Sequence, residues 1–174
     1  MSARGPSSAK SFPKIAVGIF IMSTIEMRLR ALGITLPVPV APVANYVPFT
    51  RSGRIVHISG QLSLDAAGGI KGIVGEDVDL ETACHAARLC GINLIAQIKA
   101  AADGNLDRVS RILKLGAFVQ AGSNFVEIPQ VVNGCSDLMV DVFGERGVHA
   151  RSAVGVYRIP LGFAVEVGAI VELD

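Results

Sequence analysis

The chain has 174 residues, of which 51% are hydrophobic, and this is enough for one domain with a sizeable core. Its 16 Lys and Arg residues nearly balance its 15 Asp and Glu residues, so it lacks the basic excess of proteins that bind nucleic acids. With two Tyr, seven Phe and no Trp, it also has little aromatic surface on which bases could stack.

Residues 1–21 differ in composition from the rest of the chain. The first 14 are rich in Ser, Pro and Lys, and the apolar run at 15–21 is far shorter than the ~20 residues that span a bilayer. No small-x-small cleavage site comes after this run, so we expect no secretory signal. We predict that residues 1–21 are an extension, either flexible or belonging to a mis-assigned start, before a single domain at 22–174 in a cytoplasmic protein.

The first elements of that domain are short. Apolar residues at helical spacing predict a helix over 24–32. Three prolines within 36–42 exclude both a helix and a central strand, so this segment is predicted to be extended. Strands at 45–50 and 54–60 flank the turn residues 51–53 and are predicted to form a hairpin, with Pro48 restricting the first strand to an edge or a bulge.

A glycine-rich loop at 64–79 comes next, with room for one short strand and with no phosphate-binding pattern. Either Asp77 or Asp79 is placed to cap the longest helix, which should run to about Ala102. Its apolar residues fall on one stripe, as expected for a helix packed on a sheet: Leu80, Ala83, Ala87, Cys90, Leu94 and Ile98.

The second half of the chain completes the sheet. A buried strand is predicted at 111–120, a second helix at 129–143 with Gly144 at its end, and two strands at 150–156 and 164–171. Strands interleaved with two helices predict the α+β class, with a single mixed sheet that carries the two helices on one face.

The last two strands are predicted to pair as a hairpin about a turn near Pro160. Period-two alternation places the valines of both strands on the core face. Arg151 and Glu166 then emerge together on the other face, ~13 Å apart by strand rise. A cation and a carboxylate at this separation leave room for a small carboxylate and a water, with Ala153 as the floor of the cleft.

The same alternation assigns small apolar residues to the face that the helices leave open: Ala153, Gly155, Gly168 and Ile170. Such residues do not prefer water, so we expect the chain to form oligomers through this face.

The cysteines and histidines carry weaker signals. Cys84, Cys90 and Cys135 are an odd set without paired metal-ligand spacing, so neither a disulfide framework nor a structural metal is expected. His57 and His149 have no partner Ser or Cys at a recognisable spacing, so we predict that neither has a catalytic role.

Several short motifs together resemble the Rid family, the YjgF-type reactive intermediate deaminases. They are Asn45-Tyr46, Ile58-Ser59-Gly60-Gln61, Asn133, Ala150-Arg151-Ser152 and Val165-Glu166-Val167. The resemblance runs from about Ala41 to Glu172. It implies a chorismate-mutase-like fold and a homotrimer whose sheets line a central barrel, with sites between subunits. Active members hydrolyse imines or enamines such as 2-aminoacrylate to 2-keto acids and ammonia, and they need no cofactor.

The resemblance also implies roles for individual residues. A guanidinium such as that of Arg151 holds the carboxylate of an α-imino acid by two parallel hydrogen bonds. Glu166 activates a water for attack and returns the proton to the departing nitrogen. The Tyr46 hydroxyl and the Gly60 backbone position the substrate, and Asn133 contributes a hydrogen bond across the subunit boundary.

One residue departs from the family pattern, since Ala153 stands where many members have Cys. If that Cys were the nucleophile, this chain would be inactive; if water attacks, Ala153 only enlarges the pocket. Three alternatives to the deaminase are open: a non-catalytic trimer that binds small carboxylates or partner proteins, an endoribonuclease that the charge balance disfavours, and a surface pair of Arg151 and Glu166 with no function.

Overall fold

The computed structural model describes residues 24–39 and 45–174, so the predicted N-terminal extension lies outside the described residues. The helices are α1 (Thr24–Ala31), α2 (Leu80–Ala101) and α3 (Ile128–Phe143), with short 3-10 turns at Leu106–Arg108, Gly144–Gly147 and Pro160–Gly162. The strands are β1 (Phe49–Ser52), β2 (Ile55–Leu62), β3 (Val109–Gln120), β4 (Ala150–Val156) and β5 (Val165–Leu173).

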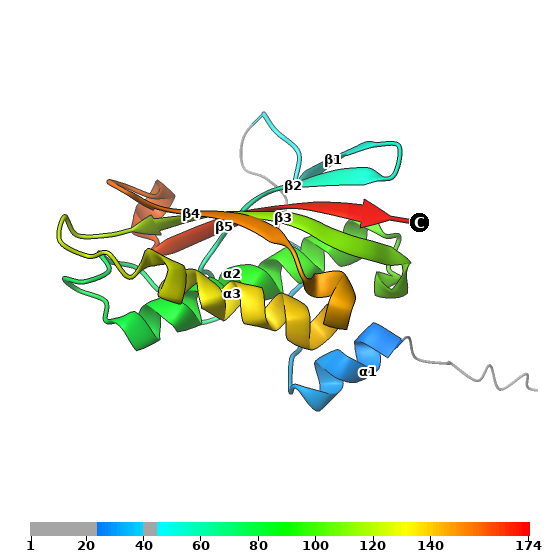
Figure 1. Ribbon diagram of the computed structural model, residues 1–174, viewed down its shortest axis with the longest axis horizontal. Coiled ribbons are helices and arrows are strands. Elements are labelled where there is room, and N and C mark those ends of the chain that lie inside the picture. The colour runs from blue at the N-terminus through cyan, green and yellow to red at the C-terminus, as the bar shows by residue number, and fades with distance from the viewer. Residues whose placement is uncertain (1–23, 40–44) are drawn as a thin grey trace, which may run out of the picture.

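One mixed sheet organises the fold, in the order β1-β2-β5-β3-β4. β3 and β4 run parallel, and the other neighbouring pairs are antiparallel. Helices α2 and α3 lie side by side on one face of this sheet, and α1 packs farther out beside the end of α3 (Figure 1). The predicted α+β class and the single sheet with two helices on one face are therefore confirmed, with α1 as a third helix.

Most elements lie where the sequence predicts them. The three helices match their predicted ranges to within a residue or two, and the Asp79 carboxylate caps α2 by accepting a hydrogen bond from the backbone N–H of Thr82 at 2.7 Å. β1 begins at Phe49 rather than at 45 because Pro48 has no N–H to donate to a ladder. The loop at 64–79 contains isolated bridges but no regular strand.

The predicted hairpin of the last two strands is wrong. β4 and β5 do not pair, because β3 lies between them and pairs with both. β3, α3 and β4 form a crossover unit, and a helix between two strands returns the second strand parallel to the first. The link from β4 to β5 passes over the end of β3, where the Gln120 side chain accepts a hydrogen bond from the backbone N–H of Ile159 at 2.9 Å.

The alternation prediction holds for β5 and fails for β4. In β5 the five core-facing residues are at most 5% exposed: Val165, Val167, Ala169, Val171 and Leu173. In β4, Val154 is 47% exposed. Ala153 and Gly155 face the helices instead, and a Cβ on Gly155 would lie 3.5 Å from Cδ1 of Ile128 in α3. That distance is an ordinary van der Waals contact, so α3 lies against this face of the edge strand.

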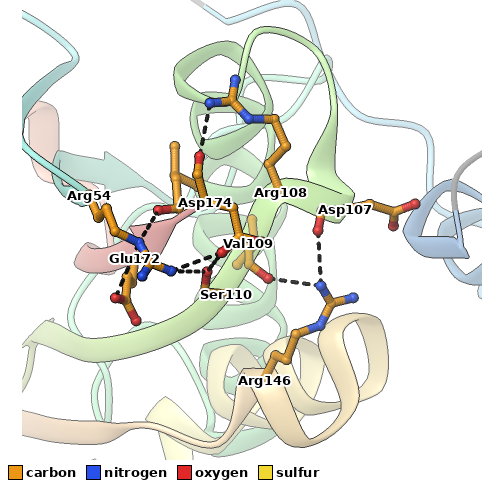
Figure 2. A network of polar contacts seen from close by, with 9 residues as sticks. Arg54, Asp107, Arg108, Val109, Ser110, Arg146, Glu172 and Asp174 are labelled. Carbon is orange, nitrogen blue, oxygen red and sulfur yellow. Dashed lines mark hydrogen bonds and ion pairs between the residues drawn. The ribbon is translucent and has the colours of Figure 1, made fainter.

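Two arginines hold the C-terminus, and a third, Arg146, holds the backbone of Asp107, which caps α1 (Figure 2). Arg54 donates to the Asp174 carboxylate at 2.9 Å, and Arg108 donates to the Asp174 carbonyl at 3.0 Å. Arg146 donates to the carbonyl of Asp107 at 3.1 Å. The carboxylate of Asp107 in turn accepts hydrogen bonds from the first two backbone N–H groups of α1, which caps that helix. No helix of the described residues is long and apolar enough to cross a membrane.

Close contact between α2 and α3 depends on glycine. A Cβ on Gly134 would collide with the carbonyl oxygen of Cys84, and a Cβ on Gly91 would lie 2.8 Å from Cδ2 of Leu138. Both distances are too short for real Cβ contacts, so the two helix backbones approach as far as hydrogen atoms allow.

Gly134→Ala is therefore expected to lower the free energy of unfolding by about 1–3 kcal/mol, because the added methyl group forces two backbones apart. Urea unfolding at fixed protein concentration measures this. Gln130→Ala, at an exposed position of the same helix, is the matched control and should stay within about 0.5 kcal/mol of the wild type. An unchanged midpoint for Gly134→Ala would mean that the helices can separate freely.

Candidate functional site

Arg151 lies near the start of the edge strand β4, directly opposite Leu115 of β3. Its guanidinium is held against α3 by three acceptors. Nη1 donates to Oδ1 of Asn133 at 2.8 Å and to Oγ of Ser136 at 3.1 Å, and Nη2 donates to the carbonyl of Pro129 at 3.2 Å. The sequence predicts a hydrogen bond of Asn133 across the subunit boundary, whereas here Asn133 accepts one from Arg151 of its own chain.

A serine and a histidine to which the sequence assigns no role complete this cluster. Nε2 of His149 lies 3.0 Å from Oγ of Ser136, and its Nδ1 lies 2.6 Å from the carbonyl oxygen of Gly147. A carbonyl only accepts, so Nδ1 carries the proton, and in the neutral ring Nε2 accepts from the Ser136 hydroxyl. The pair is 13 positions apart on two elements, so no local spacing could have revealed it.

We call these residues the arginine group: Asn133, Ser136, His149, Arg151 and Ala153. Ala153 belongs to it because it lies two residues beyond Arg151 on the same strand face, packed against the core. All members lie on β4, on α3 or on the short link between them. The arginine group therefore occupies one edge of the sheet, on the side that the helices cover.

Glu166 lies in β5, in the middle of the sheet, with its carboxylate over Gly60 of β2. A Cβ on Gly60 would collide with Oε1 of Glu166, so glycine is required for the side chain to lie there. The site is half-buried, and this burial raises the pKa of Glu166 above its ordinary 4.5. Within the described part of the chain no Lys, Arg or His makes an ion pair with it. Because Gly60 has no side chain, the Glu166 carboxylate can lie close to the backbone of β2.

Tyr46 lies beside the same part of β2. The Ser59 hydroxyl donates to the carbonyl of Val47 at 2.8 Å, which joins the segment before β1 to the residue next to Gly60. The Tyr46 side chain is 57% exposed. Gly60 and Glu166 form a second cluster, which we call the glutamate group, and Tyr46 lies next to Val47, which Ser59 joins to this part of β2.

The two groups lie on opposite faces of the sheet. Arg151 aligns with Leu115 and Ala169, which are buried beneath the helices. Glu166 aligns with Phe118 and Val154, which are 44% and 47% exposed on the open face. Aligned residues of neighbouring strands share a face.

The prediction that Arg151 and Glu166 share one face is consequently wrong. The reason is the position of β3, which moves β4 two strands away from β5. The prediction that Ala153 and Gly155 lie on the open face with Gly168 and Ile170 fails for the same reason. The two groups are offset by ~10 Å across the sheet and by a similar distance along it, with the sheet itself between them.

The remaining chemistry-bearing side chains point to structural roles. The three free cysteines are Cys84, Cys90 and Cys135, and burial raises the pKa of Cys90 well above its ordinary value and that of Cys135 to about 12. Such thiols are poor nucleophiles. Among the described residues, no group of three or more His, Cys, Asp or Glu side chains is arranged to hold a metal ion. Two hollows of about 290 and 360 Å³ lie between α1, residues 34–39 and α2, away from both groups.

Residues 26–173 match the family described as YjgF/chorismate_mutase-like, putative endoribonuclease. The chain belongs to this family. Protein TCP17 of Trypanosoma cruzi is 45% identical to it over 152 residues, which cover 86% of this chain and 94% of that protein. The predicted resemblance to the YjgF-type, or Rid, proteins is therefore confirmed.

Solved structures of similar proteins share the fold. A crystal structure of an Agrobacterium tumefaciens protein of unknown function is 48% identical, with a TM-score of 0.81, and the match covers 86% of this chain and 92% of that one. RidA from an Antarctic Psychrobacter bacterium is 26% identical, with a TM-score of 0.53, and the match covers 78% and 94%. Both comparisons support the chorismate-mutase-like sheet and helices.

Glu166→Gln is expected to raise the stability of the protein at pH 7. Burial raises the pKa of Glu166 in the folded state, so the wild type loses stability as the pH rises from below 4.5 through the folded pKa. Gln keeps the shape over Gly60 without the charge. The difference in the free energy of unfolding between variant and wild type should vanish at about pH 3.5, where the Glu166 carboxyl is protonated in both the folded and the unfolded state. Denaturant midpoints at both pH values test this, and a wild type that is more stable at pH 7 would reveal a cationic partner.

Proposed function

We propose that this protein hydrolyses imines and enamines of small α-imino acids, of the 2-aminoacrylate type, to 2-keto acids and ammonia. Arg151 holds the substrate carboxylate and Glu166 activates the water. The protein acts as a homotrimer with its sites between subunits, so that the arginine group of one subunit faces the glutamate group of the next. Membership of the YjgF family supports a small-molecule deaminase or a related role.

The observation that carries this proposal is the placement of the two groups on opposite faces of one sheet. A small α-imino acid cannot touch Arg151 and Glu166 of the same chain, because the sheet lies between them. A ring of three copies in a head-to-tail arrangement brings one edge of each sheet to the next subunit and solves this problem. The open face supplies apolar surface for such a ring, including Phe118 and Val154 in line with Glu166.

Arg151 is suited to hold a carboxylate. A guanidinium has five N–H donors, and the three acceptors on α3 leave donors free for a ligand. Two parallel hydrogen bonds to the substrate carboxylate fix the α-imino acid in one orientation and present its imine carbon. The small Ala153 beside Arg151 leaves space for the substrate side chain.

Glu166 is suited to move the proton. A carboxylate with a raised pKa is a better base than an ordinary surface glutamate and a better acid once it has been protonated. It takes a proton from the water as the water oxygen bonds to the carbon of the protonated imine, which gives a neutral carbinolamine. It then returns that proton to the nitrogen. As the C–N bond breaks and ammonia leaves with the bonding electron pair, Glu166 accepts the proton of the carbinolamine hydroxyl, and the C=O bond of the 2-keto acid forms. Each turnover consumes one imine and one water and forms one 2-keto acid and one ammonia.

The endoribonuclease activity in the family description is a weaker candidate for this chain. Two arginines gather at the C-terminus, and Arg54 is paired there with the carboxylates of Glu172 and Asp174 (Figure 2). Arg108 is paired with the carboxylate of Asp103. They are therefore not free to follow a phosphate backbone, which needs unpaired cations.

The decay of 2-aminoacrylate generated by a pyridoxal-phosphate lyase tests the reaction. The wild type is expected to accelerate it, and Glu166→Gln to lower the rate by about 10²-fold because the proton carrier is lost. Arg151→Ala should lower kcat/KM by about 10- to 100-fold through the lost charged hydrogen bonds. A wild type that leaves the decay unchanged but binds 2-keto acids would favour the non-catalytic carboxylate-binding trimer.

Mixing the two inactive variants tests the division of the site. If subunits of Arg151→Ala and Glu166→Gln are unfolded together and refolded, about one quarter of the sites in random trimers should combine an intact Arg151 with an intact Glu166. Activity should return to that fraction of the wild type. No recovery from trimers shown by light scattering to be mixed would contradict an intersubunit site.

Gly60→Ala should displace the Glu166 carboxylate and lower activity by up to about 10²-fold, because a catalytic group moved by ~1 Å loses most of its effect. The flexible glutamate can move aside, so the unfolding midpoint should change little. In the Glu166→Gln background the same substitution should cause no further loss of activity. Additive losses would show that Gly60 acts independently of Glu166.

A further inference from the structure

We propose that Ser136 and His149 are positioning residues that hold the Arg151 guanidinium ready for a carboxylate before the ligand arrives. The inference rests on the proposed function, because it assigns a role within the same carboxylate site. Neither residue belongs to the motifs that point to the family, and neither needs to touch the substrate.

Arg151 is exposed, yet it is fixed by groups on α3. Its three acceptors are an amide oxygen, a hydroxyl oxygen and a backbone carbonyl, so none of them is an anion that would neutralise the guanidinium. Nη1 directs both of its N–H groups at side chains of α3, and Nη2 uses one. By count, one N–H of Nη2 and the N–H of Nε remain, which are two donors for a bidentate carboxylate.

The hydrogen bonds in this cluster have a single consistent direction. The Gly147 carbonyl fixes the proton of His149 on Nδ1, so Nε2 accepts the hydroxyl proton of Ser136. Because that proton is committed to His149, Oγ of Ser136 presents lone pairs to Nη1 of Arg151. Without His149 the hydroxyl is free to rotate and to donate elsewhere, for instance to the Asn133 amide oxygen that Arg151 also uses.

This arrangement has an energetic purpose. A free arginine side chain populates many rotamers, and a ligand that must order it loses affinity through the lost rotamer entropy. An arginine already held in the free protein binds its carboxylate without that loss. Ser136 and His149 therefore contribute to substrate affinity through Arg151 and contribute little to the proton transfer at Glu166.

Two histidine variants separate the positions of the ring nitrogens. His149→Gln places an amide oxygen near the position of Nε2 and so keeps an acceptor for the Ser136 hydroxyl. The shorter side chain of His149→Asn reaches only the position of Nδ1, so the acceptor for Ser136 is lost. We expect Ser136→Ala and His149→Asn to weaken pyruvate binding and raise KM by about 3- to 10-fold, with kcat nearly constant. His149→Gln should recover part of the affinity. His85→Asn, at an exposed histidine of α2, is the matched control.

The ¹⁵N relaxation of the Arg151 Nε–H group gives a readout that needs no ligand or activity, and Arg151→Lys assigns its signal. It should report an ordered side chain in the wild type and His85→Asn, and a mobile one in Ser136→Ala and His149→Asn with unchanged unfolding midpoints. An equally ordered Arg151 in all variants, or a loss in kcat instead of KM, would overturn the positioning role. If Arg151 responds as expected while the wild type neither binds pyruvate nor accelerates imine decay, the proposed function fails and the positioning stands.

Discussion

The crossover from β3 through α3 to β4 is the constraint on which the candidate site depends. Because a helix separates the two strands, β4 returns parallel to β3 and takes the edge of the sheet, and β5 is left to pair on the other side of β3. This places Arg151 at an edge of the sheet beneath α3, where three acceptors bind its guanidinium. It also places Glu166 in the centre of the sheet on the open face. The division of the site is a consequence of the connectivity of one βαβ unit.

Sequence patterns sufficed wherever a local rule decides the structure. The α2 cap depends on the short reach of the Asp79 carboxylate, and the buried face of β5 follows from the period-two alternation of its side chains. The motif residues Arg151, Asn133, Gly60 and Glu166 take part in contacts that the structure contains, and their role in a site stays a prediction. These are properties of single segments.

What the sequence could not supply is the arrangement between segments. Two adjacent strands with a short link resemble a hairpin until the pairing of β3 is known, and the assumed hairpin assigned Arg151 to the wrong face. Val154 was assigned to the core by the alternation of valines in β4, yet it is 47% exposed, and Gly155 lies beside Ile128 of α3 instead. Ser136 and His149 meet only because α3 and the start of β4 lie side by side. Each of these facts depends on a packing distance, which composition and periodicity do not contain.

The separation of Arg151 and Glu166 also explains why burial can raise the pKa of Glu166 and why the Arg151 guanidinium is bound by uncharged acceptors. If Arg151 and Glu166 faced each other within one chain, they would form an ion pair, which would lower the pKa of the carboxyl and occupy the guanidinium. On opposite faces, Glu166 keeps a pKa that burial raises, and Arg151 is held by uncharged acceptors that leave its charge intact. A substrate between two subunits would then meet a free cation and a basic carboxylate at once. Within one chain, the sheet therefore keeps the two groups apart, and neither neutralises the charge of the other.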